Sequence, residues 1–106
     1  MIANTPKTPY YAVIFTSINT AEGIDYSEMT DLMVQLAQQQ DGFLGIESAR
    51  NELGITISYW RDLESVKKWK ENTEHSADRE RGRKEWYKAF KTRIALVERD
   101  YGFERD

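Results

Sequence analysis

Residues Tyr10 to Ile18 read Tyr-Tyr-Ala-Val-Ile-Phe-Thr-Ser-Ile, and this stretch decides the fold. It is rich in β-branched and aromatic residues and too short for a typical globular helix, so it predicts a β-strand. Alternation along a strand places three large side chains on one face: Tyr11, Val13 and Phe15. The opposite face carries Ala12 and Ile14. Because both faces are apolar, both have to be covered, either by the same chain or by a partner.

The hydrophobic pattern after this strand predicts five further elements. Apolar residues at helical spacing from Met29 to Ala37 predict a helix over about residues 26–39. Two strands are expected at 43–50 and 54–61, separated by a loop of hairpin length. A second helix begins after Asp62 as its N-cap, and its signal weakens through three later positions. These positions are Ala77, Trp86 and Tyr87. The last strand is predicted over residues 90–97.

The resulting order, β-α-β-β-α-β, predicts an α+β fold of the ferredoxin-like type, an antiparallel sheet with both helices on one face. The chain has 106 residues, which fits one domain. We expect an extended N-terminal segment over residues 1–8, the domain over 9–103 and a polar tail over 104–106. The sequence shows no signal-peptide core and no apolar run of membrane-spanning length, so we expect a cytoplasmic protein with no membrane partner.

Charge and composition exclude several classes of function. With no Cys and one His, the chain has no thiol nucleophile and no His-rich zinc site, so no metal site is expected. The net charge is −3. A basic excess is confined to residues 61–93, which contain 11 basic and 7 acidic side chains. This excess fits a solvated helix face or a rim that attracts a small anion. The strand at 54–61 also lacks the basic–Gly–aromatic pattern of an RNA-recognition motif, so no nucleic-acid partner is expected.

The helices of such a unit cover only one face of its sheet, while the first strand is apolar on both. A large apolar face in a soluble protein usually marks an interface. We therefore expect a homodimer joined through the sheet faces with two-fold symmetry, a dimeric α+β barrel. Small-molecule regulatory modules share the same order of elements, but they need a partner domain, and we expect a single domain here.

The chain resembles the antibiotic biosynthesis monooxygenase domain over about residues 9–103. The resemblance rests on Tyr59-Trp60-Arg61-Asp62 at the end of a strand and on the helix that follows it. That helix and its continuation carry four matching positions: Ser65, Val66, Trp69 and His75. The ending Arg93 to Phe103 is similar to a group of uncharacterised bacterial members. The resemblance implies a dimeric barrel with a pocket between sheet and helices in each subunit.

Some members of that family oxidise polycyclic phenols with O2 and use neither metal nor flavin, so the resemblance to them implies no cofactor. The positions that match their catalytic residues are Ser65, Trp69 and His75. Ser65 replaces an Asn and His75 replaces a Tyr, and a His can still move a proton near neutral pH. The pocket for a small aromatic or quinol-type substrate would be lined by four aromatic side chains: Tyr11, Phe15, Tyr59 and Trp86.

Each of these residues also has a structural interpretation. Trp69 fits the apolar helix stripe as a core residue, Ser65 fits a first-turn capping role, and His75 fits a helix end. A second branch of the family degrades haem with a His ten residues beyond the helix Trp, where this chain has Arg79. Two hypotheses remain open, a cofactor-independent monooxygenase and a non-catalytic dimeric small-molecule-binding protein of the same fold.

Overall fold

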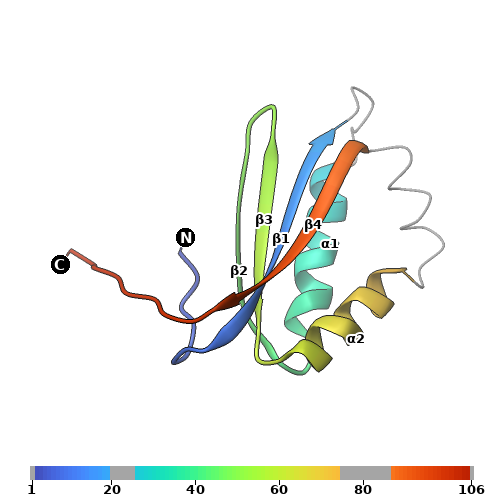
Figure 1. The fold of residues 1–106 in the computed structure, drawn as a ribbon. Coiled ribbons are helices and arrows are strands. Elements are labelled where there is room, and N and C mark those ends of the chain that lie inside the picture. The colour runs from blue at the N-terminus through green and yellow to red at the C-terminus, as the bar shows by residue number, and fades with distance from the viewer. Residues whose placement is uncertain (1, 20–25, 75–86, 106) are drawn as a thin grey trace.

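The computed structural model describes residues 2–19, 26–74 and 87–105 and has the predicted ferredoxin-like architecture (Figure 1). Its four strands are β1 (Tyr10–Asn19), β2 (Phe43–Arg50), β3 (Gly54–Trp60) and β4 (Tyr87–Val97). Its two helices are α1 (Tyr26–Gln38) and α2 (Leu63–Glu74), and both lie on one side of the sheet. The α+β class and the order of elements predicted from the sequence are therefore confirmed.

The sheet is antiparallel with the strand order β2-β3-β1-β4, so β1 lies inside it. Val13 of β1 lies opposite Ser58 of β3 and Ile94 of β4. Directly opposite residues share a face, so the register divides all four strands into one helix-covered face and one face turned away from the helices. We call the second the open face.

The core lies between the helices and the middle of the sheet. Its buried members come from β1, α1, β3 and α2: Val13, Ala37, Trp60 and Val66. Trp60 is completely buried, and its indole N–H donates a 2.9 Å hydrogen bond to the Ser58 hydroxyl. This bond satisfies the polar atom that a buried Trp brings into the core.

Two local expectations need correction. Tyr87, assigned to the weak end of the second helix, is the first residue of β4, which begins three residues earlier than predicted. Its pairing with Asn19 of β1 across the sheet explains the difference, because a contact between residues so far apart leaves no local periodicity. Leu32, predicted on the buried stripe of the first helix, is 49% exposed.

The N-terminal segment, residues 2–9, lies on the open face. The backbone N–H of Ala3 donates a 2.9 Å hydrogen bond to the Glu47 carboxylate on β2. Ala3 also covers Gly45, where an added Cβ would lie 3.1 Å from the Ala3 methyl. At the other terminus, residues 98–105 run beyond the end of β4 in Figure 1. None of the described helices is long and apolar enough to cross a membrane.

Candidate aromatic binding site

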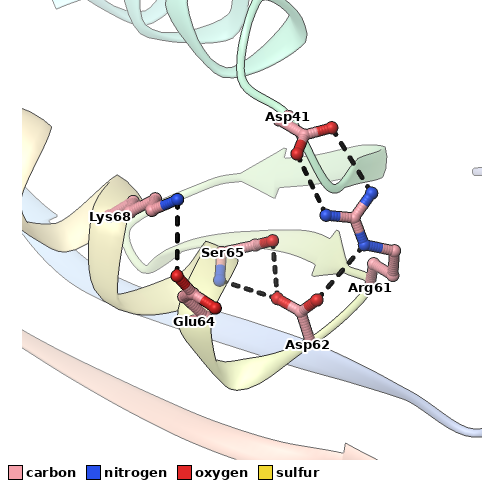
Figure 2. A network of polar contacts seen from close by, with 6 residues as sticks. All are labelled: Asp41, Arg61, Asp62, Glu64, Ser65 and Lys68. Atoms are coloured by element: carbon pink, nitrogen blue, oxygen red, sulfur yellow. Dashed lines mark hydrogen bonds and ion pairs between the residues drawn. The ribbon is translucent and has the colours of Figure 1, made fainter.

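The predicted site residue Ser65 lies in the first turn of α2, and Asp62 caps that turn. The Asp62 carboxylate accepts hydrogen bonds from the Ser65 hydroxyl at 2.7 Å and from the Ser65 backbone N–H at 2.8 Å (Figure 2). The hydroxyl bond, then the backbone bond and then Arg61 lower the pKa of Asp62 to about 2. The predicted role of Asp62 as the N-cap of this helix is confirmed. The Ser65 hydroxyl is already engaged, because it donates a hydrogen bond to the capping carboxylate.

Arg61 connects the start of α2 to the turn after α1. Its guanidinium meets Asp41 at 3.0 Å and Asp62 at 3.2 Å, and its backbone N–H donates to the Gly42 carbonyl at 2.8 Å. The hydrogen bonds from Arg61 lower the pKa of Asp41. The ion pairs are exposed to solvent, so we expect them to orient the two turns more than to stabilise the fold.

Trp69 lies where the core reaches the surface of α2. Its ring stacks on Trp60 with a centroid distance of 5.5 Å and an interplanar angle of 27°, and its side chain is half-buried. Trp69 therefore packs on the core with one part and meets solvent with another. Both the core and the pocket-wall interpretations of this residue are compatible with that position.

A row of apolar side chains lies on the helix-side face along β1 and β4. We call this row the aromatic shelf, and it consists of Phe15, Tyr87, Phe90, Ile94 and Leu96. The Phe15 ring lies 5.4 Å from the Tyr87 ring and 5.5 Å from the Phe90 ring. Although this is the face that the helices cover, Phe90 is 43% exposed and Ile94 51%. Among the described residues, the main helix contacts lie on strands other than β4, with α2 on β1 and β3 and α1 on β2.

One polar group lies at the end of this shelf. Asn19 is the register partner of Tyr87, so the two side chains share a face. The Asn19 side-chain oxygen is buried and has no hydrogen-bond partner among the described residues. A buried oxygen without a donor carries a desolvation cost that a ligand hydroxyl would relieve. The shelf thus combines aromatic rings with an unused hydrogen-bond acceptor.

The predicted binding residues do not all meet at the shelf. Tyr11 and Phe15 lie on the helix side, whereas Tyr59 lies on the open face. There the Tyr59 hydroxyl donates a 2.5 Å hydrogen bond to Glu47, and its ring meets the Tyr10 ring edge-on at 5.6 Å. Burial and then the Glu47 contact raise the pKa of Tyr59, while the Tyr59 bond lowers the pKa of Glu47. The structure therefore separates Tyr59 from Trp69.

The remaining predicted site residues, His75 and Trp86, lie outside the described residues. Sequence reasoning assigned Tyr87 to a helix and gave Phe90, Ile94 and Asn19 no part in the site. The alternation of Phe90, Thr92, Ile94 and Leu96 was the available signal for the shelf. Within the described ranges, no group of three or more His, Cys, Asp or Glu side chains is placed to hold a metal ion.

Comparison with known proteins places the chain in a family. No family model matches the sequence. The uncharacterised protein YqjZ of Bacillus subtilis is 42% identical over 107 residues, a match that covers 99% of this chain and 94% of YqjZ. The chain belongs to the YqjZ family.

The fold of this chain is shared by solved structures, among them proteins described as putative antibiotic biosynthesis monooxygenases. The structure of PA3566 from Pseudomonas aeruginosa superimposes with a TM-score of 0.67 at 20% identity, covering 91% of this chain and 99% of PA3566. SnoaB, a cofactor-independent oxygenase from Streptomyces nogalater, gives a TM-score of 0.63 at 8% identity, covering 92% of this chain and all of SnoaB. At these identities the likeness establishes the fold alone, which confirms the fold implied by the sequence resemblance.

Proposed function

We propose that this YqjZ-family protein is a cofactor-independent monooxygenase that oxidises a small aromatic, quinol-type substrate with O2. The aromatic shelf is the observation that carries the proposal. Its rings offer offset and edge-on contacts to a flat ligand, and its half-exposed aliphatic residues would be covered when that ligand binds. The fold shared with SnoaB, described as a cofactor-independent oxygenase, supports the same class of reaction.

The proposed reaction uses the substrate as its own reductant. Loss of a phenolic proton makes the ring an electron-rich anion, which transfers electrons to O2. One oxygen atom forms a bond to carbon, the other leaves as water, and the substrate is oxidised to a quinone. The protein has to orient the ring, accept the proton and hold the anion.

We assign these tasks to residues at and near the shelf. Phe15 and Tyr87 would contact the ring, and the oxygen of Asn19, the register partner of Tyr87, would accept a hydrogen bond from a substrate hydroxyl. Trp69 would border the pocket at the Tyr11 end, because it stacks on Trp60, which lies opposite Tyr11. His75 is proposed as the group that takes the phenolic proton. Ser65 would act indirectly, because its hydroxyl donates to Asp62 and so helps to fix the first turn of the helix that carries Trp69.

The binding step is tested with anthrone-like phenols and quinols in a thermal-shift assay. A ligand at 100 times its dissociation constant stabilises the native state by about 2.7 kcal/mol, a shift of several degrees for a domain of this size. Ile94→Lys places a charge on the shelf and is expected to abolish the shift. Leu32→Lys is the matched control, since Leu32 is 49% exposed on α1 and Ile94 51% on β4. Equal shifts in both variants would remove the shelf from the site.

The chemical step is tested by oxygen uptake with any phenol that binds. His75→Ala is expected to abolish uptake while binding persists, and Asn19→Leu is expected to weaken binding of hydroxylated ligands more than of their non-hydroxylated analogues. Unchanged uptake in the His75 variant would refute the assigned role of that residue.

A second candidate function is a dimeric small-molecule-binding protein without catalysis. The use of the Ser65 hydroxyl in the helix cap favours it, because a position that matches a catalytic residue of the active family then supplies no donor to a substrate. Ligand-dependent oxygen consumption would exclude this candidate. A thermal shift without any oxygen consumption would support it.

For either function we propose a homodimer joined through the open faces. Isoleucine side chains from β1 and β3 lie on this face, and Ile18 and Ile55 remain exposed in the single chain. Sedimentation equilibrium at micromolar concentration should give twice the chain mass of 12.4 kDa. A mass of one chain would refute the dimer.

A further inference from the structure

The segment after β4 leaves the body of the domain while it carries large apolar side chains. We call residues 98–105 the C-terminal arm. All of its residues are exposed, Tyr101 completely and Phe103 by 83%. Figure 1 shows the arm extending past the N-terminal segment and away from the helices. Two aromatic rings held in water by an extended segment indicate a surface that is covered in the assembled protein.

The base of the arm is tied to its own domain. The Tyr10 hydroxyl donates a hydrogen bond to the Asp100 carboxylate and accepts one from Thr5 at 2.8 Å. This contact connects the arm to the start of β1 and to the N-terminal segment. Since Tyr10 is buried, the arm has a defined starting point and direction as it leaves the sheet.

The open face divides into a covered half and an uncovered half. Near the start of β1, Tyr10 and Ala12 are buried, and Thr5 of the N-terminal segment donates a hydrogen bond to the Tyr10 hydroxyl. Toward the other end lies a set of small and branched apolar residues that we call the open patch. It consists of Ile14, Ile18, Ala49, Ile55 and Ile57. Ile18, Ala49 and Ile55 are exposed and the other two are half-buried.

We propose that the arm of one subunit lies on the open patch of a second copy of this chain, with Tyr101 and Phe103 as its anchors. This inference rests on the proposed dimer, and it adds the segment that holds the dimer together. The arrangement is reciprocal, because a two-fold axis gives each copy one arm and one patch. The occupant is thus a defined segment of this chain.

The positions of arm and patch favour exchange between two copies over a contact within one. The arm leaves the sheet at the Tyr10 end of β1, whereas the patch extends to the Ile18 end. When two sheets pack face to face about an axis that crosses the strands, the Tyr10 end of one copy meets the Ile18 end of the other. Each arm then starts beside the partner's patch.

Length and charge agree with this placement. Eight extended residues span about 26 Å, whereas a sheet of four strands is about 15 Å across, so the arm can cross the whole sheet of a partner. Lys91 and Arg93 of β4 are on the open face beside the patch, since Lys91 lies opposite Thr16 and Arg93 opposite Ile14. The arm carries three acidic and two basic side chains, so its net charge of −1 is opposite in sign. One of the two basic residues, Arg105, lies over the Phe103 ring of its own arm, 5.8 Å from the ring centroid.

The energetic test compares dimer dissociation constants by sedimentation velocity. Tyr101→Ser combined with Phe103→Ser is expected to raise the constant at least about 30-fold, because buried aromatic anchors dominate interface energies. Both side chains are exposed in the single chain, so the fold of the subunit should not change. Leu63→Ser is the control, since Leu63 is 53% exposed but lies on α2, away from the open face.

The possible outcomes distinguish the proposed dimer from the proposed role of the arm. A wild-type protein that sediments as a monomer refutes both proposals. A wild-type dimer whose dissociation constant is the same in the arm variant and the Leu63 control refutes the role of the arm and leaves the dimer in place.

The geometric test is a photocross-link from p-benzoylphenylalanine at position 103. A mixture of that protein with 15N-labelled wild-type chain should yield light–heavy cross-links to peptides of β1 or β3. Cross-links confined to the light chain itself, or to the helices of the partner, would overturn the proposed placement.

Discussion

Gly42, in the turn after α1, is the position where a single methyl group should have the largest effect. Its backbone has φ of +87°, in the region that L-residues with a side chain rarely adopt. A Cβ built on Gly42 would lie 2.1 Å from the Ser65 hydroxyl oxygen and 2.7 Å from the Ser65 Cβ. Ser65 is buried and holds the helix cap, so its side chain has little room to move away.

The cost of Gly42→Ala follows from these two features. The left-handed backbone costs roughly 1–2 kcal/mol for a residue with a Cβ. Forcing a methyl group into a packed position typically adds about 1–3 kcal/mol. We expect the free energy of unfolding to fall by about 2–5 kcal/mol, a large part of the total of roughly 5–15 kcal/mol for a domain of this kind.

Urea denaturation followed by Trp fluorescence and circular dichroism measures this loss. With a slope of about 1–3 kcal/mol per molar urea, the midpoint should fall by roughly 0.7–5 M, and by about 2 M at the middle of both ranges. Gly102→Ala is the control, because a Cβ there meets no atom within 4 Å in its own chain. Since Gly102 lies between the proposed dimer anchors, both glycine variants are compared in the Tyr101→Ser/Phe103→Ser background, where Gly102→Ala should not change the midpoint. Ser65→Ala in the Gly42→Ala background removes the closer of the two contacts and should recover about 1 kcal/mol, a non-additive effect.

A loss below about 0.5 kcal/mol for Gly42→Ala, the size of an ordinary surface change, would refute the packing of Gly42 against Ser65. Strict additivity of the two substitutions would refute their contact even if the single variant is unstable. The result also bears on function, because it measures how far Ser65 is committed to structure.

Four further outcomes are expected. Trp60→Ala should lower the free energy of unfolding by about 3–5 kcal/mol in urea titrations, since this fully buried ring carries the contact with Trp69. The lowered pKa of Glu47 gives stability that is present above the unfolded-state pKa of about 4.3 and is lost as pH falls through the folded-state pKa. Glu47→Gln should therefore cost stability at pH 7 and lose less than the wild type on acidification, as measured by thermal unfolding. The pKa of Tyr59 is raised, so its contribution to stability depends on pH in the opposite direction: it is present below the unfolded-state pKa of about 10 and is lost as pH rises above it. Tyr59→Phe should lose less stability than the wild type over that pH range. Asp62→Asn should remove part of the acid sensitivity between pH 4 and pH 2, because the pKa of Asp62 is lowered to about 2.

The candidate site shows which inferences a sequence supports and which it does not. Alternation assigned Tyr11 and Tyr59 to faces of their own strands, but it does not relate the face of one strand to the face of another. The register of β1 against β3 does so, and it places the two tyrosines on opposite sides of the sheet. Resemblance to a family matched Ser65 with a catalytic position, and only the geometry showed that its hydroxyl donates to Asp62.

The sequence by itself determined the order and type of the elements and the cap of α2. These features depend on local periodicity and on neighbouring residues such as Asp62 and Ser65, so the local amino-acid sequence is enough to predict them. The tertiary structure decided that Tyr87 begins β4, that the helices leave the aromatic shelf half-exposed, and that the N-terminal segment lies on the open face. Those outcomes depend on contacts between residues distant in the chain, such as Asn19 with Tyr87 and Ala3 with Glu47. Their energies depend on register and packing, which no local pattern contains.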